Sequence, residues 1–319
     1  MPTHRPLFPD LLFEPAKRLR TWEARLMALF SDEGYQELRP SLVSQKRETK
    51  ASREMLALDG EGGVSALRSD FTVALADLFV ARFPSPPRRV SYAGPVFREP
   101  LGAWEAAERF EVGCEHTGPA EESSEADRAL YTLLAKVPDA LGLGGGTLKL
   151  GHAGLVRRPL DDEGITGPTR KAYVRALSVR AHHRVDEALA SAPTDTRERL
   201  SLHAKALLDD APDESPYRAR IEGEIRAIDE AEAVCKEALP RRIRVRKDHA
   251  DVTGIDFYTG PTFALWAPYA SAELVAGGRY DALYPSLGKP WCAAGFCVRL
   301  SRLLDLHEAH PELFAEVVS

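Results

Sequence analysis

The chain has 319 residues, of which 42 are basic and 48 acidic, so its formal net charge is −6 at neutral pH. A chain of this length can bury a large core as one large domain or two smaller ones, and the acidic balance argues against a general nucleic-acid-binding surface. The N-terminus holds prolines and acids, and no run approaches the roughly 18 apolar residues of a membrane span. We therefore expect a cytoplasmic protein without a signal peptide or a membrane partner.

The first half of the chain alternates helix and strand patterns. Apolar residues recur at helical spacing from Pro15 to Gly34, which predicts a helix with a proline in its first turn and a glycine at its end. The elements predicted after it are a short strand at 34–40, a helix at 69–83, strands at 90–97 and 109–115, a helix at 125–143 and a strand at 147–153. Ser69 and Asp70 are candidate N-caps of the second helix.

The amino-acid composition changes in the second half of the chain. From about 168 to 238 it is rich in Ala, Leu and Arg, which predicts a helical insertion in a mixed chain. Strand patterns return at 243–248, 256–268 and 272–278, and a last helix follows Gly295. Strands at both ends without regular βαβ alternation predict an α+β fold, an antiparallel sheet flanked by helices.

Several short motifs fit structural roles better than chemical ones. The glycine run at 142–146 lacks the Lys-Ser/Thr of a phosphate loop and follows a helix, which favours a flexible joint. His182 and His183 are adjacent in a helical run and do not share a face, which argues against paired metal ligation. Cys292 and Cys297 have no neighbouring histidine, so buried thiols are favoured over a zinc site. We expect neither a metal nor a cofactor.

Four stretches form a spaced constellation: LRSDFT at 67–72, GPVFRE at 94–99, TGIDFYTG at 253–260 and AAGFCVRLSRLL at 293–304. Over about residues 8–308 the chain resembles the catalytic domain of class II aminoacyl-tRNA synthetases, and within them the histidyl-tRNA synthetases. The resemblance implies one synthetase-like core over 1–319, interrupted by the helical insertion at about 168–238.

The resemblance also implies an amino-acid pocket. In it Arg98 would reach an α-phosphate or a carboxylate and Arg302 a terminal phosphate, contacts that guanidinium groups make well. Asp70 would hold the α-ammonium, and Glu115 with Tyr258 would face the imidazole. The candidates for histidine binding are Asp70, Thr72, Arg98, Glu111, Glu115 and Tyr258. The candidates for a vestigial ATP site are Arg98 and Arg302.

The chain departs from the synthetase pattern at four positions. Pro100 stands in place of a glutamate, Ala107 in place of a basic loop residue and Glu111 in place of a glutamine. Thr253 replaces the arginine that stabilises charge as the histidine carboxylate attacks the α-phosphate. Losing such a cation costs a few kcal/mol of barrier, on the order of a hundredfold in rate. These departures predict that synthetase activity is lost and that no residue is catalytic.

The chain ends at Ser319, and we expect no anticodon-binding domain and no tRNA partner. Such a core resembles the regulatory subunits of ATP phosphoribosyltransferase, paralogues of the synthetases. That resemblance implies a self-dimer, a hetero-octamer of four regulatory and four short catalytic subunits, and L-histidine as the feedback effector. A minimal histidyl-tRNA synthetase, or another ATP-dependent amino-acid ligase, remains the alternative because Arg98 and Arg302 are retained.

Overall fold

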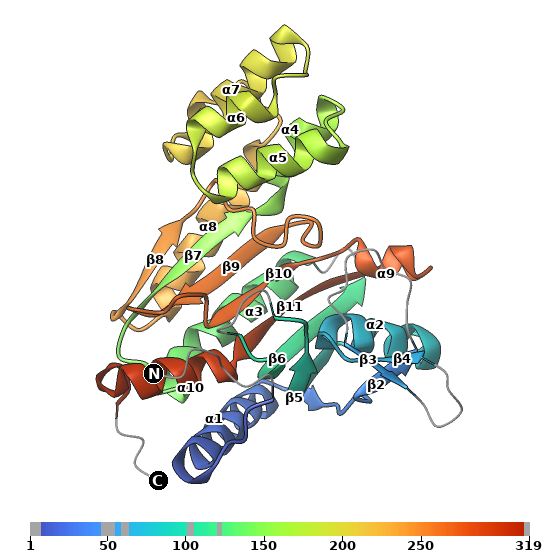
Figure 1. Cartoon of the computed structure of the whole chain (residues 1–319), viewed down its shortest axis with the longest axis vertical. Coiled ribbons are helices and arrows are strands. Elements are labelled where there is room, and N and C mark those ends of the chain that lie inside the picture. The colour runs from blue at the N-terminus through green and yellow to red at the C-terminus, as the bar shows by residue number, and fades with distance from the viewer. Residues whose placement is uncertain (1–7, 46–54, 59–63, 101–104, 120–122, 316–319) are drawn as a thin grey trace.

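The computed structural model describes residues 8–45, 55–58, 64–100, 105–119 and 123–315. Its centre is a mixed sheet of the eight strands β1 (Gln36–Glu37), β5 (Arg89–Phe97), β6 (Glu108–Pro119), β7 (Gly146–His152), β8 (Ile243–Lys247), β9 (Pro261–Trp266), β10 (Val275–Arg279) and β11 (Trp291–Arg299). Their order across the sheet is β1-β5-β6-β11-β10-β9-β7-β8, of which Figure 1 labels the strands from β5 to β8. The edge pairs β1–β5 and β7–β8 are parallel, and the pairs between them are antiparallel. The α+β fold predicted from the sequence is confirmed.

Three helices cover one face of the central strands: α1 (Phe13–Asp32), α3 (Ser123–Ala140) and α10 (Leu300–Ala309). The residues that α1 buries follow helical spacing and are Leu19, Trp22, Leu26 and Phe30. The Trp22 indole Nε1 donates to the Leu141 carbonyl over 3.1 Å. Gly34, at φ +81°, ends this helix as the sequence predicted, because a glycine adopts that left-handed conformation without strain.

The opposite face of the sheet is covered at one end by α2 (Phe71–Arg82) and α9 (Leu283–Ser286). Beside α2 lies a small antiparallel sheet that the sequence did not predict, formed by β2 (Val43–Gln45), β3 (Leu56–Leu58) and β4 (Val64–Leu67) (Figure 1). Arg68, directly after β4, is buried and links the small sheet to the main sheet by hydrogen bonds. Its guanidinium donates to the carbonyls of Pro95 at 2.7 Å and Pro40 at 2.9 Å.

The helical part of the chain begins earlier than predicted. Its elements are α4 (Ala153–Asp162), α5 (Gly167–Ser178), α6 (His182–Ala188), α7 (Thr194–Leu208), the 3-10 helix η2 (Pro212–Glu214) and α8 (Glu222–Ala238). The group α4 to α7 lies at the top of Figure 1, whereas α8 returns to pack along α3 and β7. One helix of the predicted insertion at about 168–238, α8, therefore packs against the main sheet. The boundaries of the insertion as a domain stay a prediction.

The structure also tests several local predictions. The glycine run is a joint between α3 and β7, and His182 and His183 are exposed, as expected. The strand predicted at 256–268 is shorter, because residues 253–257 form a turn and β9 begins at Pro261. The cysteines are free thiols, three buried and Cys297 partly buried. The 3-10 helix η3 (Pro311–Leu313) closes the described chain. None of the described helices has the length and apolar composition to cross a membrane.

Candidate functional site

The candidate site is a cavity of about 240 Å³ on the face of the sheet that α2 covers. Its floor comes from β5, β6, β10 and β11, and its walls come from the start of α2 and the turn before β9. The side chains and backbone that line it are those of Asp70, Phe71, Thr72, Val73, Tyr92, Arg98, Glu111, Glu115, Phe257, Tyr258, Ala276, Tyr280, Gly295, Phe296, Cys297 and Arg299. All six histidine-binding candidates are in this set, so the structure brings them together.

Strand periodicity places the two carboxylates on the same face. Glu111 and Glu115 are four residues apart on β6, and side chains at even spacing point to one side of a strand. Across the ladder to β11, Glu111 lies opposite Arg299 and Glu115 lies opposite Gly295. A Cβ at position 295 would overlap the Glu115 carboxylate, so the glycine provides the room that this side chain occupies.

Glu115 is buried and accepts hydrogen bonds from three hydroxyl groups in α2, in β5 and directly after β10. Its Oε1 accepts from Thr72 at 2.7 Å and from Tyr92 at 3.3 Å, and its Oε2 accepts from Tyr280. Burial raises the pKa of this carboxyl to about 7, while the three hydroxyl donors oppose that rise and the charge of Asp70 adds to it. Glu115 can therefore change its charge near neutral pH.

Asp70 both caps α2 and lines the cavity. Its Oδ1 accepts from the Val73 backbone amide at 2.8 Å, as an N-cap side chain does, and its Oδ2 accepts from Ser69 at 3.3 Å. The capping role that the sequence suggested is confirmed. The predicted contact of Asp70 with an α-ammonium stays a prediction, and its place in the lining is compatible with both roles.

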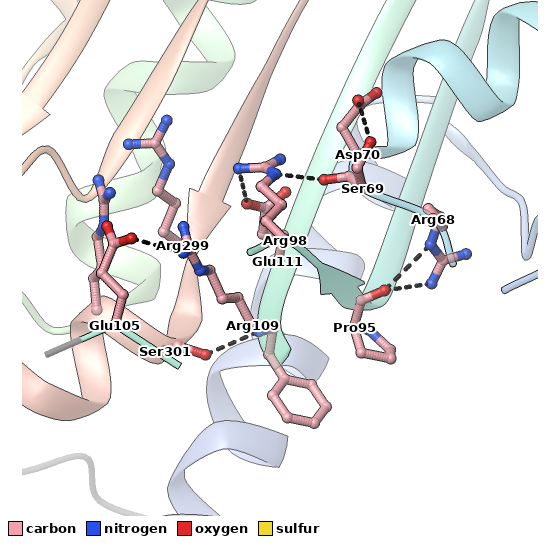
Figure 2. A network of polar contacts seen from close by, with 12 residues as sticks. Arg68, Ser69, Asp70, Pro95, Arg98, Glu105, Arg109, Glu111, Arg299 and Ser301 are labelled. Atoms are coloured by element: carbon pink, nitrogen blue, oxygen red, sulfur yellow. Dashed lines mark hydrogen bonds and ion pairs between the residues drawn. The ribbon is translucent and has the colours of Figure 1, made fainter. Parts of the chain in front are cut away.

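The cavity has a cationic end (Figure 2). Arg98 donates through Nε to the Ser69 carbonyl, and its Nη1 lies 3.5 Å from Glu111 Oε1. Burial lowers the pKa of Arg98, but the carboxylates of Glu111 and Asp70 outweigh burial and raise it overall. Arg299 pairs with Glu273, and its pKa is lowered to about 10 by burial and by neighbouring arginines.

Arg302 lies outside this cavity. Its Nη1 donates to the Glu273 carbonyl at 2.9 Å and lies 3.3 Å from Glu273 Oε1. It lines a neighbouring hollow of about 220 Å³ together with Tyr269, Asp305 and His310. The two candidates for a vestigial ATP site thus line neighbouring hollows, and the charge of Arg98 still acts on Arg302.

Neither Thr253 nor Ala107, two of the positions that depart from the synthetase pattern, places a positively charged side chain in the cavity. Thr253 is exposed in the turn before β9 and is absent from the cavity lining. Ala107 is buried beside β6, and the loop residues 101–104 lie outside the described residues. Among the residues that the structure describes, no group of three or more His, Cys, Asp or Glu side chains could hold a metal ion.

The residues of the lining that sequence reasoning missed include four aromatic side chains and one arginine. Phe71 stacks on Tyr92 with ring centroids 4.1 Å apart, and Phe257 stacks on Tyr280 at 4.9 Å. Stacked rings fix the hydroxyls of both tyrosines toward Glu115. Arg299 could have been found by counting alternate residues from Gly295 along the strand.

Comparisons with known proteins agree with this architecture. The family model for histidyl-tRNA synthetase matches residues 7–303. The chain is 33% identical over 312 residues to an ATP phosphoribosyltransferase regulatory subunit of Anaeromyxobacter sp. (strain Fw109-5), with 91% of this chain and 89% of that protein covered. It is similar to the solved structure of a histidine–tRNA ligase subunit from Alicyclobacillus acidocaldarius, with 26% identity, a TM-score of 0.75 and 98% of both chains covered.

A second solved structure shares the fold at lower identity. A chain of the ATP phosphoribosyl transferase (HisG:HisZ) complex from Thermotoga maritima is 16% identical, with a TM-score of 0.68. The match covers 91% of this chain and 98% of that one. The same sheet and helices therefore occur at nearly full length in a chain of quite different sequence.

Proposed function

The chain belongs to the histidyl-tRNA synthetase family and, within it, to the regulatory subunits of ATP phosphoribosyltransferase, and from this membership we propose that it regulates that enzyme in histidine biosynthesis. The chain binds L-histidine in the cavity and passes this signal to a short catalytic subunit, which condenses ATP with phosphoribosyl pyrophosphate. A regulatory subunit of this kind has no reaction of its own, so its effect is measured as the activity of the catalytic subunit.

The observation that carries the proposal is the convergence of all six histidine-binding candidates on one cavity. The cavity of about 240 Å³ is smaller than the ~300–1,000 Å³ typical of pockets for drug-sized ligands, which suits a ligand the size of an amino acid. Glu115 at its floor, surrounded by hydroxyl groups, offers a buried polar partner for an imidazole. Tyr258 lines the same space.

The same geometry supports the loss of synthetase activity. Adenylate formation needs cations positioned where charge develops on the α-phosphate. Thr253 is exposed and uncharged, and Arg302 lines a neighbouring hollow in contact with Glu273. Glu111 adds a negative charge 3.5 Å from the guanidinium of Arg98, the cation that remains at the predicted place. We propose that the chain forms no histidyl-adenylate and charges no tRNA.

Feedback control also requires an assembly with two states. A ligand shifts such an equilibrium only through its different affinities for the two states. We propose that the chain dimerises and joins the catalytic subunit in a hetero-octamer with four copies of each. A symmetric assembly of this kind lets binding at one site affect several partner chains.

The proposal is tested by mixing the purified chain with the short phosphoribosyltransferase from the same organism. The two chains should elute together as a large complex, and the turnover of the catalytic subunit should rise. Added histidine should then lower the turnover of the complex. A catalytic subunit that runs at full rate alone, and does not bind this chain on a sizing column, would contradict the regulatory function.

The alternative function is that of an amino-acid-activating enzyme, and the observation that favours it is Arg98 in the cavity lining. The two functions are separated by histidine-dependent exchange of pyrophosphate into ATP. We expect exchange at background level from the purified chain. Exchange well above background would show that the chain activates an amino acid and would overturn the loss of synthetase activity.

A further inference from the structure

Two guanidinium groups, those of Arg98 and Arg299, line one end of the cavity. Arg98 lies beside Glu111, while Arg299 and Arg302 both contact the single carboxylate of Glu273. Burial lowers the pKa of Arg299 to about 10, and the positive charges of Arg302 and Arg98 act in the same direction. An added anion would stabilise this end of the cavity.

The other end of the cavity carries the opposite charge. Glu115 lines it, whereas Asp70 lies near Arg98 at the start of α2, and the β6–β11 ladder fixes how far apart the two ends lie. Arg299 faces Glu111, which is four residues from Glu115, so the backbones at the two ends are about 13 Å apart at 3.3–3.4 Å per residue. The long Arg299 and Glu115 side chains shorten the gap between the charged groups. A small molecule with a carboxylate at one end and a cationic group at the other is complementary to this arrangement.

We propose that Arg299, together with Arg98, binds the carboxylate of the ligand and makes the cavity specific for an amino acid over the corresponding amine. Guanidinium groups pair with carboxylates in a planar two-pronged geometry, and the ion pair of Arg299 with Glu273 uses Nη1. Glu273 holds the side chain in place, while the rest of the guanidinium can face the cavity that Arg299 lines. This proposal rests on the proposed function, since it takes histidine as the ligand.

The test compares L-histidine with histamine, which lacks the carboxylate, by calorimetry on the full chain. A hydrogen bond to a charged group contributes about 1.5–3 kcal/mol, which corresponds to roughly a 10- to 150-fold preference for histidine. We expect Arg299→Met to reduce this preference to about threefold or less while leaving histamine affinity nearly unchanged. The matched control is Arg302→Met, because Arg302 contacts the same glutamate but lines the neighbouring hollow, and it should keep the preference.

The outcomes separate this proposal from the function on which it rests. An unchanged preference in Arg299→Met, or an equal loss for both ligands, would overturn the role of Arg299 alone. If the unaltered chain binds no histidine, the ligand assignment fails and this proposal fails with it. Arg299→Lys serves as the second variant in case the methionine variant misfolds, and it should retain a reduced preference because it keeps the charge without the two-pronged geometry. If Arg299→Lys prefers histidine over histamine as strongly as the unaltered chain does, the predicted two-pronged geometry is wrong.

Discussion

Glu115 should make the stability of the protein depend on pH, and Glu115→Gln should remove that dependence. Burial raises the pKa of this carboxyl from 4.5 to about 7, even though Thr72, Tyr92 and Tyr280 donate hydrogen bonds to it. A difference of one pKa unit between the folded and unfolded chain corresponds to about 1.4 kcal/mol. The difference between 4.5 and about 7 therefore corresponds to about 3 kcal/mol in the free energy of unfolding.

The sign follows from which state holds the proton. Between pH 4.5 and about 7 the folded chain keeps the Glu115 proton and the unfolded chain releases it. The stability that this group contributes is therefore complete below pH 4.5, falls as the pH rises through this window, and is lost above about pH 7. A glutamine at this position has no proton to release, so its contribution stays constant.

The assay is urea unfolding of both proteins at several pH values from about 5 to 8.5. Other titrating groups are shared by the two proteins and cancel in the difference between them. We expect the free energy of unfolding of Glu115→Gln, relative to the unaltered chain, to increase by about 2–3 kcal/mol across this range. A difference that stays flat with pH would show that Glu115 keeps an ordinary pKa, and would refute the account of its burial given above.

Substitutions at three further positions test the packing and the helix cap. Gly295→Ala should destabilise the fold by about 1–3 kcal/mol, because the added methyl group overlaps the Glu115 carboxylate. The control Gly223→Ala, whose methyl group meets open space in α8, should cost nothing, and equal urea midpoints for the two variants would contradict this. Trp22→Ala should cost about 3–5 kcal/mol in urea unfolding through the lost burial of the indole, and a loss below about 1 kcal/mol would be inconsistent with that burial. Asp70→Ala should lower the free energy of unfolding by about 1 kcal/mol through the lost helix cap, and Asp70→Asn should lower it much less. Calorimetry should show weaker histidine binding by both variants. Normal binding by the asparagine variant would show that Asp70 acts only as a helix cap.

The parts of the fold that the sequence predicted are those controlled by local periodicity. Leu19, Trp22 and Leu26 recur on one face of α1, and the structure buries that face. Glu111 and Glu115 share a face of β6 because their spacing is even, and this pattern agrees with the resemblance that placed both residues in one site. The small sheet β2-β4-β3 was not predicted, because strands of three or four residues carry too little alternation to separate them from loops.

The hydroxyl groups around Glu115 could not be predicted in this way. Tyr280 reaches Glu115 across 165 positions of sequence, and Thr72 and Tyr92 reach it across 43 and 23. A local pattern shows that a tyrosine is present but not which carboxylate its hydroxyl meets, because that depends on the order of strands β5, β6, β11 and β10 in the sheet. The raised pKa of Glu115 is thus a property of the tertiary fold, since its main cause is burial.

The two arginines near the end of β11 show how a single element boundary decides which residue joins the site. Arg299 is the last residue of the strand and shares its face with Gly295 and Cys297, so the period of two directs it to the cavity. Arg302 lies three residues later, after the chain has become the helix α10, and the helical period turns it to the neighbouring hollow. The sequence resemblance singled out Arg302 as a phosphate-binding residue, but it could not locate the strand–helix boundary to within one residue. Because that boundary falls at Leu300, Arg299 is the residue whose charge can select the ligand of the cavity.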